Sequence, residues 1–109
     1  MPSSTNDTRV LDLLKDMTAA SLDATNLDEQ TLMLVRIAAL VAIDAPPVSY
    51  AMNLEAAGEV GVDAEQVRGV LAAIAPIVGT TRVVSATSSI AGALALEVEL
   101  AELDNQSAH

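Results

Sequence analysis

The sequence predicts an all-α domain of about five helices packed around one buried central helix. Apolar residues make up 51% of the 109 residues, and they recur at the helical spacings of three and four. No run of alternating apolar and polar residues bounded by turn signals indicates a strand. Proline and glycine stand where the helical pattern breaks, and they divide the chain into helical segments.

The central helix is expected over residues 28–43. Asp28 can cap it by accepting a hydrogen bond from a first-turn amide, and Leu27 and Leu32 have the spacing of a hydrophobic staple. From Leu32 onward every face is apolar except at Arg36, which is typical of a helix buried on all sides. The segment is too short to span a membrane, which takes about 20 apolar residues.

Proline and apolar spacing define the helices next to the central one. The first is expected over residues 7–20, where one face carries Val10, Leu13, Leu14 and Met17. The central helix must stop before Pro46 and Pro47, because a residue that precedes proline avoids the helical conformation. Pro47 suits the first position of a third helix, which is expected to reach about Val60.

Two more helices are expected in the second half of the chain. Gly61 is predicted to end the third helix in a left-handed conformation. Asp63 and Gln66 have the spacing of a capping box that begins a fourth helix, which must kink or end at Pro76. A last helix is expected over residues 80–103, with a main apolar stripe formed by Val83, Thr87, Ile90, Leu94, Val98 and Ala101.

These helices are expected to form a single domain over residues 7–103, which is a usual domain size. Residues 1–6 are polar and are expected to be disordered. Residues 104–109 are expected to form a polar tail.

Charge and composition exclude several kinds of partner. Five basic and fifteen acidic side chains give a net charge of −10, which repels phosphate backbones and anionic lipids. We therefore expect no nucleic-acid partner and no membrane partner. The chain has no cysteine, which excludes disulfides, thiol redox chemistry and thiolate metal sites. Its N-terminal residues lack the basic start and apolar run of a signal peptide, so we expect a cytoplasmic protein.

Several short motifs occur in an order that resembles one protein family. They are Leu27-Asp28-x-x-Thr31, then Leu34-Val35-Arg36-Ile37-Ala38, then Ala56-Ala57 ahead of Gly61-Val62 and Glu65, then Gly79 before an Ala/Ser-rich helix. Together they resemble the carboxymuconolactone decarboxylase and alkylhydroperoxidase-D-like family, over about residues 27–96. Within that family, the turn at residues 45–50 is similar to short members with an Ala-Pro-Pro-x-Ser-Tyr sequence. The resemblance implies an all-helical domain that assembles into trimers or hexamers, with a site where the central helix, the next turn and the third helix meet.

The two chemistries of that family use residues that this chain lacks. The thiol peroxidases carry a Glu, a Cys-x-x-Cys pair and a His, and the lactone decarboxylases keep only the His. Alignment from Thr31 places Met33 at the Glu position, and alignment back from Gly61 places Asn53 at the His position. The two alignments differ by one residue, so the turn at residues 42–48 contains one extra residue. Thiol peroxidase chemistry is not expected, because it needs a thiolate nucleophile.

Two arginines are candidate anion-binding residues. Arg36 is a cation in an otherwise apolar helix, and such a side chain is rarely buried without a partner. It can pair with a carboxylate such as Asp44, Glu55 or Asp63, within the chain or across a subunit boundary, or it can hold the carboxylate of an acidic substrate. Arg82, near the start of the last helix, allows the same two roles, and a helix N-terminus also favours an anion.

The turn at residues 46–53 is the other candidate site. It carries Ser49, Tyr50 and Asn53 close together, and Tyr50 is the only aromatic residue of the protein. The turn suits a pocket wall, but it equally suits a tight connection between helices. The only histidine is the last residue, His109, which argues against catalysis by a histidine base and against a metal bound by histidine. No metal and no cofactor is expected.

Two functional hypotheses follow. The first is a cofactor-free, decarboxylase-like enzyme or a binding protein for a small acidic or aromatic-derived metabolite. The second is a non-catalytic helical oligomer that keeps the family fold without an active site. Self-association into a trimer or hexamer is expected in both cases, built largely on the last helix. One face of that helix carries small residues that allow close approach of two helices, namely Ser85, Ser88, Ser89 and Gly92.

Overall fold

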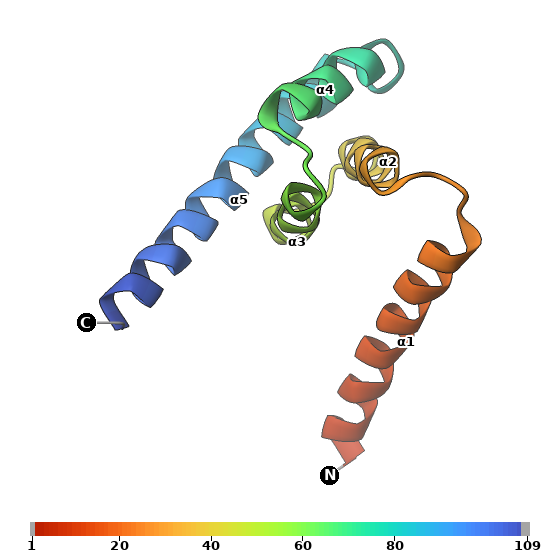
Figure 1. Cartoon of the computed structure of the whole chain (residues 1–109), viewed down its shortest axis with the longest axis vertical. Coiled ribbons are helices and arrows are strands. Elements are labelled where there is room, and N and C mark those ends of the chain that lie inside the picture. The colour runs from red at the N-terminus through yellow and green to blue at the C-terminus, as the bar shows by residue number, and fades with distance from the viewer. Residues whose placement is uncertain (1, 108–109) are drawn as a thin grey trace.

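The structure is a computed structural model that describes the backbone of residues 2–107 and the side-chain surroundings of residues 8–94. Within residues 2–107 it contains five helices and no strand, which confirms the predicted all-α fold (Figure 1). No described helix is both long enough and apolar enough to cross a bilayer. The helices are α1 (Pro2–Ala24), α2 (Glu29–Ala42), α3 (Pro47–Glu59), α4 (Ala64–Val78) and α5 (Thr80–Ser107).

Helix α2 is the central element of the arrangement, as the sequence predicts. It packs against α3, α4 and α5, while α5 also packs against α3 and α4. We call these four helices the α2–α5 body. Helix α1 packs against none of them over the described residues, and in Figure 1 it extends away from the body.

Two adjoining groups of buried side chains form the core of the α2–α5 body. Helix α2 contributes to both, through the fully buried Val41 in one and Ile37 in the other. The first group comprises Val41, Ala45, Tyr50, Ala86 and Ala93, and the second comprises Met33, Ile37 and Ala57. Most of these side chains are small or unbranched, so the helices must approach closely to bury them.

The prediction that α2 is buried on all sides is wrong for the single chain. Its buried residues lie on one face and are Leu32, Met33, Ile37 and Val41. On the other face Val35 is 51% exposed, and Ile43, the residue that ends the helix, is 71% exposed. The reason is that α3, α4 and α5 cover one side of α2, while α1 does not cover the other.

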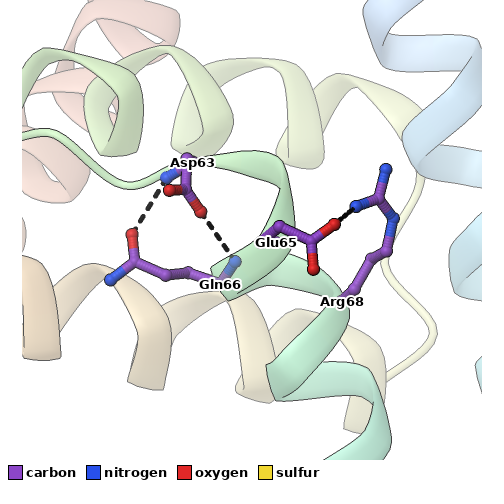
Figure 2. Close-up of polar contacts among 4 residues, drawn as sticks. All are labelled: Asp63, Glu65, Gln66 and Arg68. Atoms are coloured by element: carbon purple, nitrogen blue, oxygen red, sulfur yellow. Dashed lines mark hydrogen bonds and ion pairs between the residues drawn. The ribbon is translucent and has the colours of Figure 1, made fainter.

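The ends of the helices follow the predicted local chemistry. Asp28 caps α2, with its Oδ1 accepting a hydrogen bond of 2.8 Å from the amide of Thr31. Asp63 and Gln66 form the predicted capping box at the start of α4, in which each side chain bonds to the backbone of the other (Figure 2). Gly61 has a φ of 89° at the end of α3, which confirms its predicted left-handed conformation.

Helix α2 also ends at a residue in the left-handed conformation, although that residue is not a glycine. Asp44 has a φ of 56°, which is a left-handed conformation that an aspartate tolerates better than most residues. The amide of Ala45 donates to the carbonyl of Leu40 at 3.0 Å, and the amide of Asp44 donates to that of Val41 at 3.1 Å. These are the two hydrogen bonds of a Schellman motif, and they reverse the chain before Pro46.

Two helices, α1 and α5, extend beyond the ranges predicted for them, and α4 continues past its proline. Helix α1 begins at Pro2 rather than near residue 7, so the helix includes positions that we expected to be disordered, and it ends at Ala24. Helix α4 continues past Pro76 to Val78, because a proline in the last turn removes only one hydrogen bond near the helix end. Helix α5 reaches Ser107 and so includes most of the expected polar tail, while Met1, Ala108 and His109 lie outside the described residues.

The face of α5 that packs in the core agrees only in part with the predicted stripe, of which Ile90 packs against the core and Val83 is half-buried. Ala86 and Ala93 are buried, whereas Thr87 and Leu94 of the predicted stripe are exposed. Gly92 is exposed, but a Cβ atom added there would lie 3.9 Å from Pro47, so this small residue lies beside α3. Two of the small residues expected between subunits, Ser85 and Gly92, therefore contribute to contacts of α5 within the chain.

Candidate functional site

Tyr50 lies inside the core rather than at a pocket. Its side chain is fully buried, and no described residue forms a hydrogen bond with its hydroxyl group. Burial raises the pKa of this hydroxyl, and the negative charge of Asp44 raises it further. The only aromatic side chain of the protein thus packs the α2–α3 turn onto α5, together with Ala86 and Ala93.

Ser49 and Asn53 are joined to each other within α3. The Nδ2 of Asn53 donates to the carbonyl oxygen of Ser49 at 2.9 Å, and both residues are half-buried. The amide of Ser49 donates in turn to the carbonyl of Pro46 at 3.0 Å. These bonds stabilise the first turns of α3, which supports the role of a helix connection for this segment.

Asp44 ties the same turn to α5. Its Oδ1 accepts a hydrogen bond of 2.5 Å from the hydroxyl of Ser85. Asp44 was one of the carboxylates that we expected to pair with Arg36, and no ion pair joins these two described residues. The bond crosses from the end of α2 to α5 and helps to fix the strained residue Asp44 in place.

Arg36 has a different partner from the ones predicted. Its Nη2 donates to the hydroxyl of Ser21 in α1 at 3.1 Å. Among the described residues, no carboxylate forms an ion pair with Arg36, so the structure shows none of the pairings with Asp44, Glu55 or Asp63 that we expected within the chain. The one ion pair among the described residues is between Arg68 and Glu65. Arg36 thus connects α1 to α2 instead.

Arg82 is exposed near the start of α5 and forms no hydrogen bond or ion pair with a described residue. None of the hydrogen bonds among described residues joins Arg36 or Arg82 to the turn at residues 46–53. The structure therefore brings Ser49 and Asn53 together, but it does not join the five candidate residues, Arg36, Ser49, Tyr50, Asn53 and Arg82, into one site.

A pocket of about 400 Å³ lies elsewhere in the α2–α5 body, between α3, α4 and α5. Its wall is mostly apolar, and none of the five predicted site residues lines it. The lining residues are Leu54, Ala57, Val62, Asp63, Ala64, Val67, Arg68, Leu71, Thr87, Ile90, Ala91 and Leu94.

Three of the lining residues are polar, and only one of them has donors to spare. Asp63 accepts the amide of Gln66, and the hydroxyl of Thr87 donates to the carbonyl of Val83 at 2.9 Å. Arg68 donates from Nη1 to Glu65, one turn earlier on the exposed side of α4 (Figure 2). A guanidinium group has five N–H donors, so this one ion pair leaves most of them available to an anion. The pocket thus combines an apolar interior with one arginine, which is 66% exposed and paired with Glu65.

Arg68 was not recognised from the sequence as a site residue. It lies three residues after Glu65, a spacing that is typical of an ordinary surface ion pair on a helix. The sequence did contain one indication that Arg68 could be a site residue. The whole chain has only five basic residues, and Arg68 stands between Val67 and Leu71, two apolar residues that line the pocket. Among the described residues, no group of three or more acidic or histidine side chains could hold a metal ion.

The fold and the family match together define the class of protein. The helices form an all-α, alkylhydroperoxidase-D-like domain, and residues 9–91 match the carboxymuconolactone decarboxylase family. The chain belongs to the carboxymuconolactone decarboxylase family, as its motifs predict. Comparison with curated proteins and with solved structures gave no match.

Proposed function

We propose that this protein binds a small molecule with an apolar body and one carboxylate group in the pocket between α3, α4 and α5. The proposal rests on one observation, which is the apolar pocket of about 400 Å³ with Arg68 among its lining residues. Its size lies within the range of about 300–1,000 Å³ that is usual for small-molecule sites.

The two parts of such a ligand would be bound by different forces. Its apolar body would lose contact with water against Leu54, Val67 and Leu71, which stabilises the complex by about 25 cal/mol per Å² of buried apolar surface. Its carboxylate would accept hydrogen bonds from the planar guanidinium of Arg68, a geometry that suits two parallel bonds. The ligand class is that expected from the sequence, but the arginine is a different one.

The pocket offers binding groups more readily than catalytic groups. Asp63 is its only lining carboxylate, and this side chain is engaged in the capping box of α4. A cofactor-free, decarboxylase-like conversion would have to move a proton through Asp63, since the arginine stays protonated at all ordinary pH values. Binding is therefore the function that we propose, and conversion of the ligand is the extension that Asp63 would allow.

The test is a thermal-shift screen of small cyclic carboxylates and lactones, followed by titration of the best ligand. A ligand that binds only the native state, at 100 times its Kd, raises stability by about 2.7 kcal/mol. We expect Arg68→Gln to weaken binding about tenfold, because a charge-assisted hydrogen bond contributes roughly 1.5–3 kcal/mol and this side chain is partly exposed.

Two further arginine variants provide matched controls. Arg36→Gln and Arg82→Gln remove the same charge outside the pocket, and we expect them to leave the affinity unchanged. The uncharged amide of the ligand should bind equally to the wild-type protein and to Arg68→Gln. Loss of affinity in Arg36→Gln or Arg82→Gln instead of Arg68→Gln would assign the anion to one of the arginines predicted from the sequence.

The same screen separates this proposal from the alternative of a non-catalytic oligomer. Under that alternative no carboxylate or lactone changes the melting temperature, even at millimolar concentration. Ala91→Phe provides a second check, because Ala91 lines the pocket and is exposed, so a larger side chain there can fill the pocket without disturbing the core.

A further inference from the structure

Helix α1 has an apolar side and a polar side. Its described apolar side chains lie on one side at spacings of three, four and seven, as in Val10, Leu14 and Met17. We call this side the α1 stripe, which consists of Val10, Leu11, Leu13, Leu14, Met17 and Leu22. Every residue of the stripe is 51–58% exposed.

The connection to α2 holds α1 away from its own body. The hydroxyl of Ser21 accepts from Arg36 of α2 at 3.1 Å. The amide of Leu27 donates to the hydroxyl of Thr25 at 3.2 Å, and Asp28 caps α2 directly afterwards. With this connection, α1 packs against no helix of the α2–α5 body over the described residues and extends away from it (Figure 1).

The surface area and the radius of gyration of the chain also indicate that it is more extended than a compact monomer. The chain exposes 7560 Å², whereas a compact monomer of 11.2 kDa exposes about 5,700 Å², an excess of about 1,900 Å². Its radius of gyration is 16.0 Å, compared with about 13 Å for a compact domain of 109 residues. A stable interface takes about 800 Å² from each partner, so the excess is sufficient for more than one such contact.

We propose that α1 is an arm that packs its apolar stripe against a second copy of this chain. A membrane surface is a less suitable partner. The polar side of the helix carries Asp12, Asp16 and Asp23 against Arg9 and Lys15, and the whole chain has a charge of −10, so anionic lipids repel it. A second copy, in contrast, brings apolar surface of its own, including Val35, Ile43 and Met52 at 51%, 71% and 69% exposure.

This inference differs from the expectation of an interface on the small face of α5. Ser85 and Gly92 of that face contribute to contacts inside the chain, whereas the stripe of α1 has no contact there. It is also independent of the proposed ligand pocket, because no residue of α1 lines that pocket.

The experiment compares Leu14→Glu with Ala19→Glu by light scattering at micromolar concentration. Both variants add one negative charge to α1, but Ala19 lies on the polar side of the helix. We expect the wild-type protein and Ala19→Glu to have a mass that is a multiple of 11.2 kDa, and Leu14→Glu to have a lower mass. Circular dichroism should show the same helix content in all three, because Leu14 makes no contact with the body.

Three results would overturn the inference. They are a monomeric wild-type protein, an unchanged oligomer in Leu14→Glu, and dissociation of both variants to the same extent. If Leu14→Glu unfolds, spin labels at Met17→Cys and Ala19→Cys replace it, since the chain has no other cysteine. The label at position 17 should then be immobile and the label at 19 mobile in the oligomer, and equal mobility would contradict the proposal.

Discussion

Tyr50 is the residue whose role in the structure differs most from the role that we considered for it in the sequence. In the sequence it stands in a turn with other polar side chains, which suits either a pocket wall or a tight connection between helices. In the structure its ring completes the core, and its hydroxyl is buried without a partner among the described residues. A buried hydroxyl of this kind destabilises a protein, because it has lost its bonds to water and gained none.

We therefore predict that Tyr50→Phe does not destabilise the protein at pH 7 and raises its free energy of unfolding by about 1 kcal/mol. The change leaves the ring in place and removes only the oxygen atom. Urea unfolding followed by circular dichroism measures the difference. A loss of 1 kcal/mol or more would show that the hydroxyl has a partner that stabilises the fold.

From the same side chain we predict that the stability of the protein falls at alkaline pH. Because the pKa of Tyr50 is raised in the folded state, the unfolded chain ionises first, near pH 10. The contribution of Tyr50 to stability is fully present below that pH and is lost as pH rises through the folded-state pKa. Wild type should therefore lose more stability than Tyr50→Phe between pH 9 and about pH 11. The absorbance of tyrosinate reports this residue alone, since the chain has one Tyr and no Trp.

The absence of cysteine gives a further prediction at this scale. Peroxidase chemistry of the thiol type requires a thiolate that attacks the peroxide, and this chain has none. We predict no turnover of an alkyl hydroperoxide by the pure protein above a heat-inactivated control. Peroxide consumption that rises in proportion to the concentration of protein would refute this.

At the scale of the helices, the capped ends were predictable, whereas the ends of α1, the C-terminal end of α5 and the buried faces were not. Asp28, Gly61 and the Asp63–Gln66 box depend on residues three or four apart, so the sequence contains all the information that they need. Which face of α2 or α5 is buried depends on neighbours distant in sequence. Composition does not reveal that Ala86 and Ala93, rather than Thr87 and Leu94, face the core.

The end of α2 offers a test of local strain. Asp44 is in a left-handed conformation and accepts a hydrogen bond from Ser85, so a substitution there has two opposing effects. In a Ser85→Ala background the hydrogen bond is already absent. There we predict that Asp44→Gly raises the free energy of unfolding by about 1 kcal/mol, because glycine adopts this conformation without strain.

Asp44→Asn in the wild-type background serves as the control. Asparagine tolerates the left-handed conformation and keeps an oxygen that can accept from Ser85, so we expect a change of less than about 0.5 kcal/mol. Both values come from urea unfolding curves. A lower stability of Asp44→Gly in the Ser85→Ala background would show that the backbone at this position is not strained.

At the scale of the whole molecule, the sequence predicted the family and the number of helices but not the position of the pocket. The motifs and caps are local, and they identify the carboxymuconolactone decarboxylase family correctly. The pocket lies between α3, α4 and α5, and its lining comes from residues 54 to 94 of the chain. In the sequence, the apolar residues that line the pocket belong to the apolar faces of separate helices. Only the packed structure shows that these faces leave a space between them.

The position of the ligand is the most direct test of our conclusions on function. Methyl groups of the labelled protein can be followed by NMR while the best ligand of the screen is added. We predict the largest shifts at Leu54, Leu71 and Ile90, which line the pocket, and no shifts at Val48 and Met52 of the α2–α3 turn and the start of α3. Shifts confined to Val48 and Met52 would contradict the pocket and place the site at the turn that the sequence had favoured.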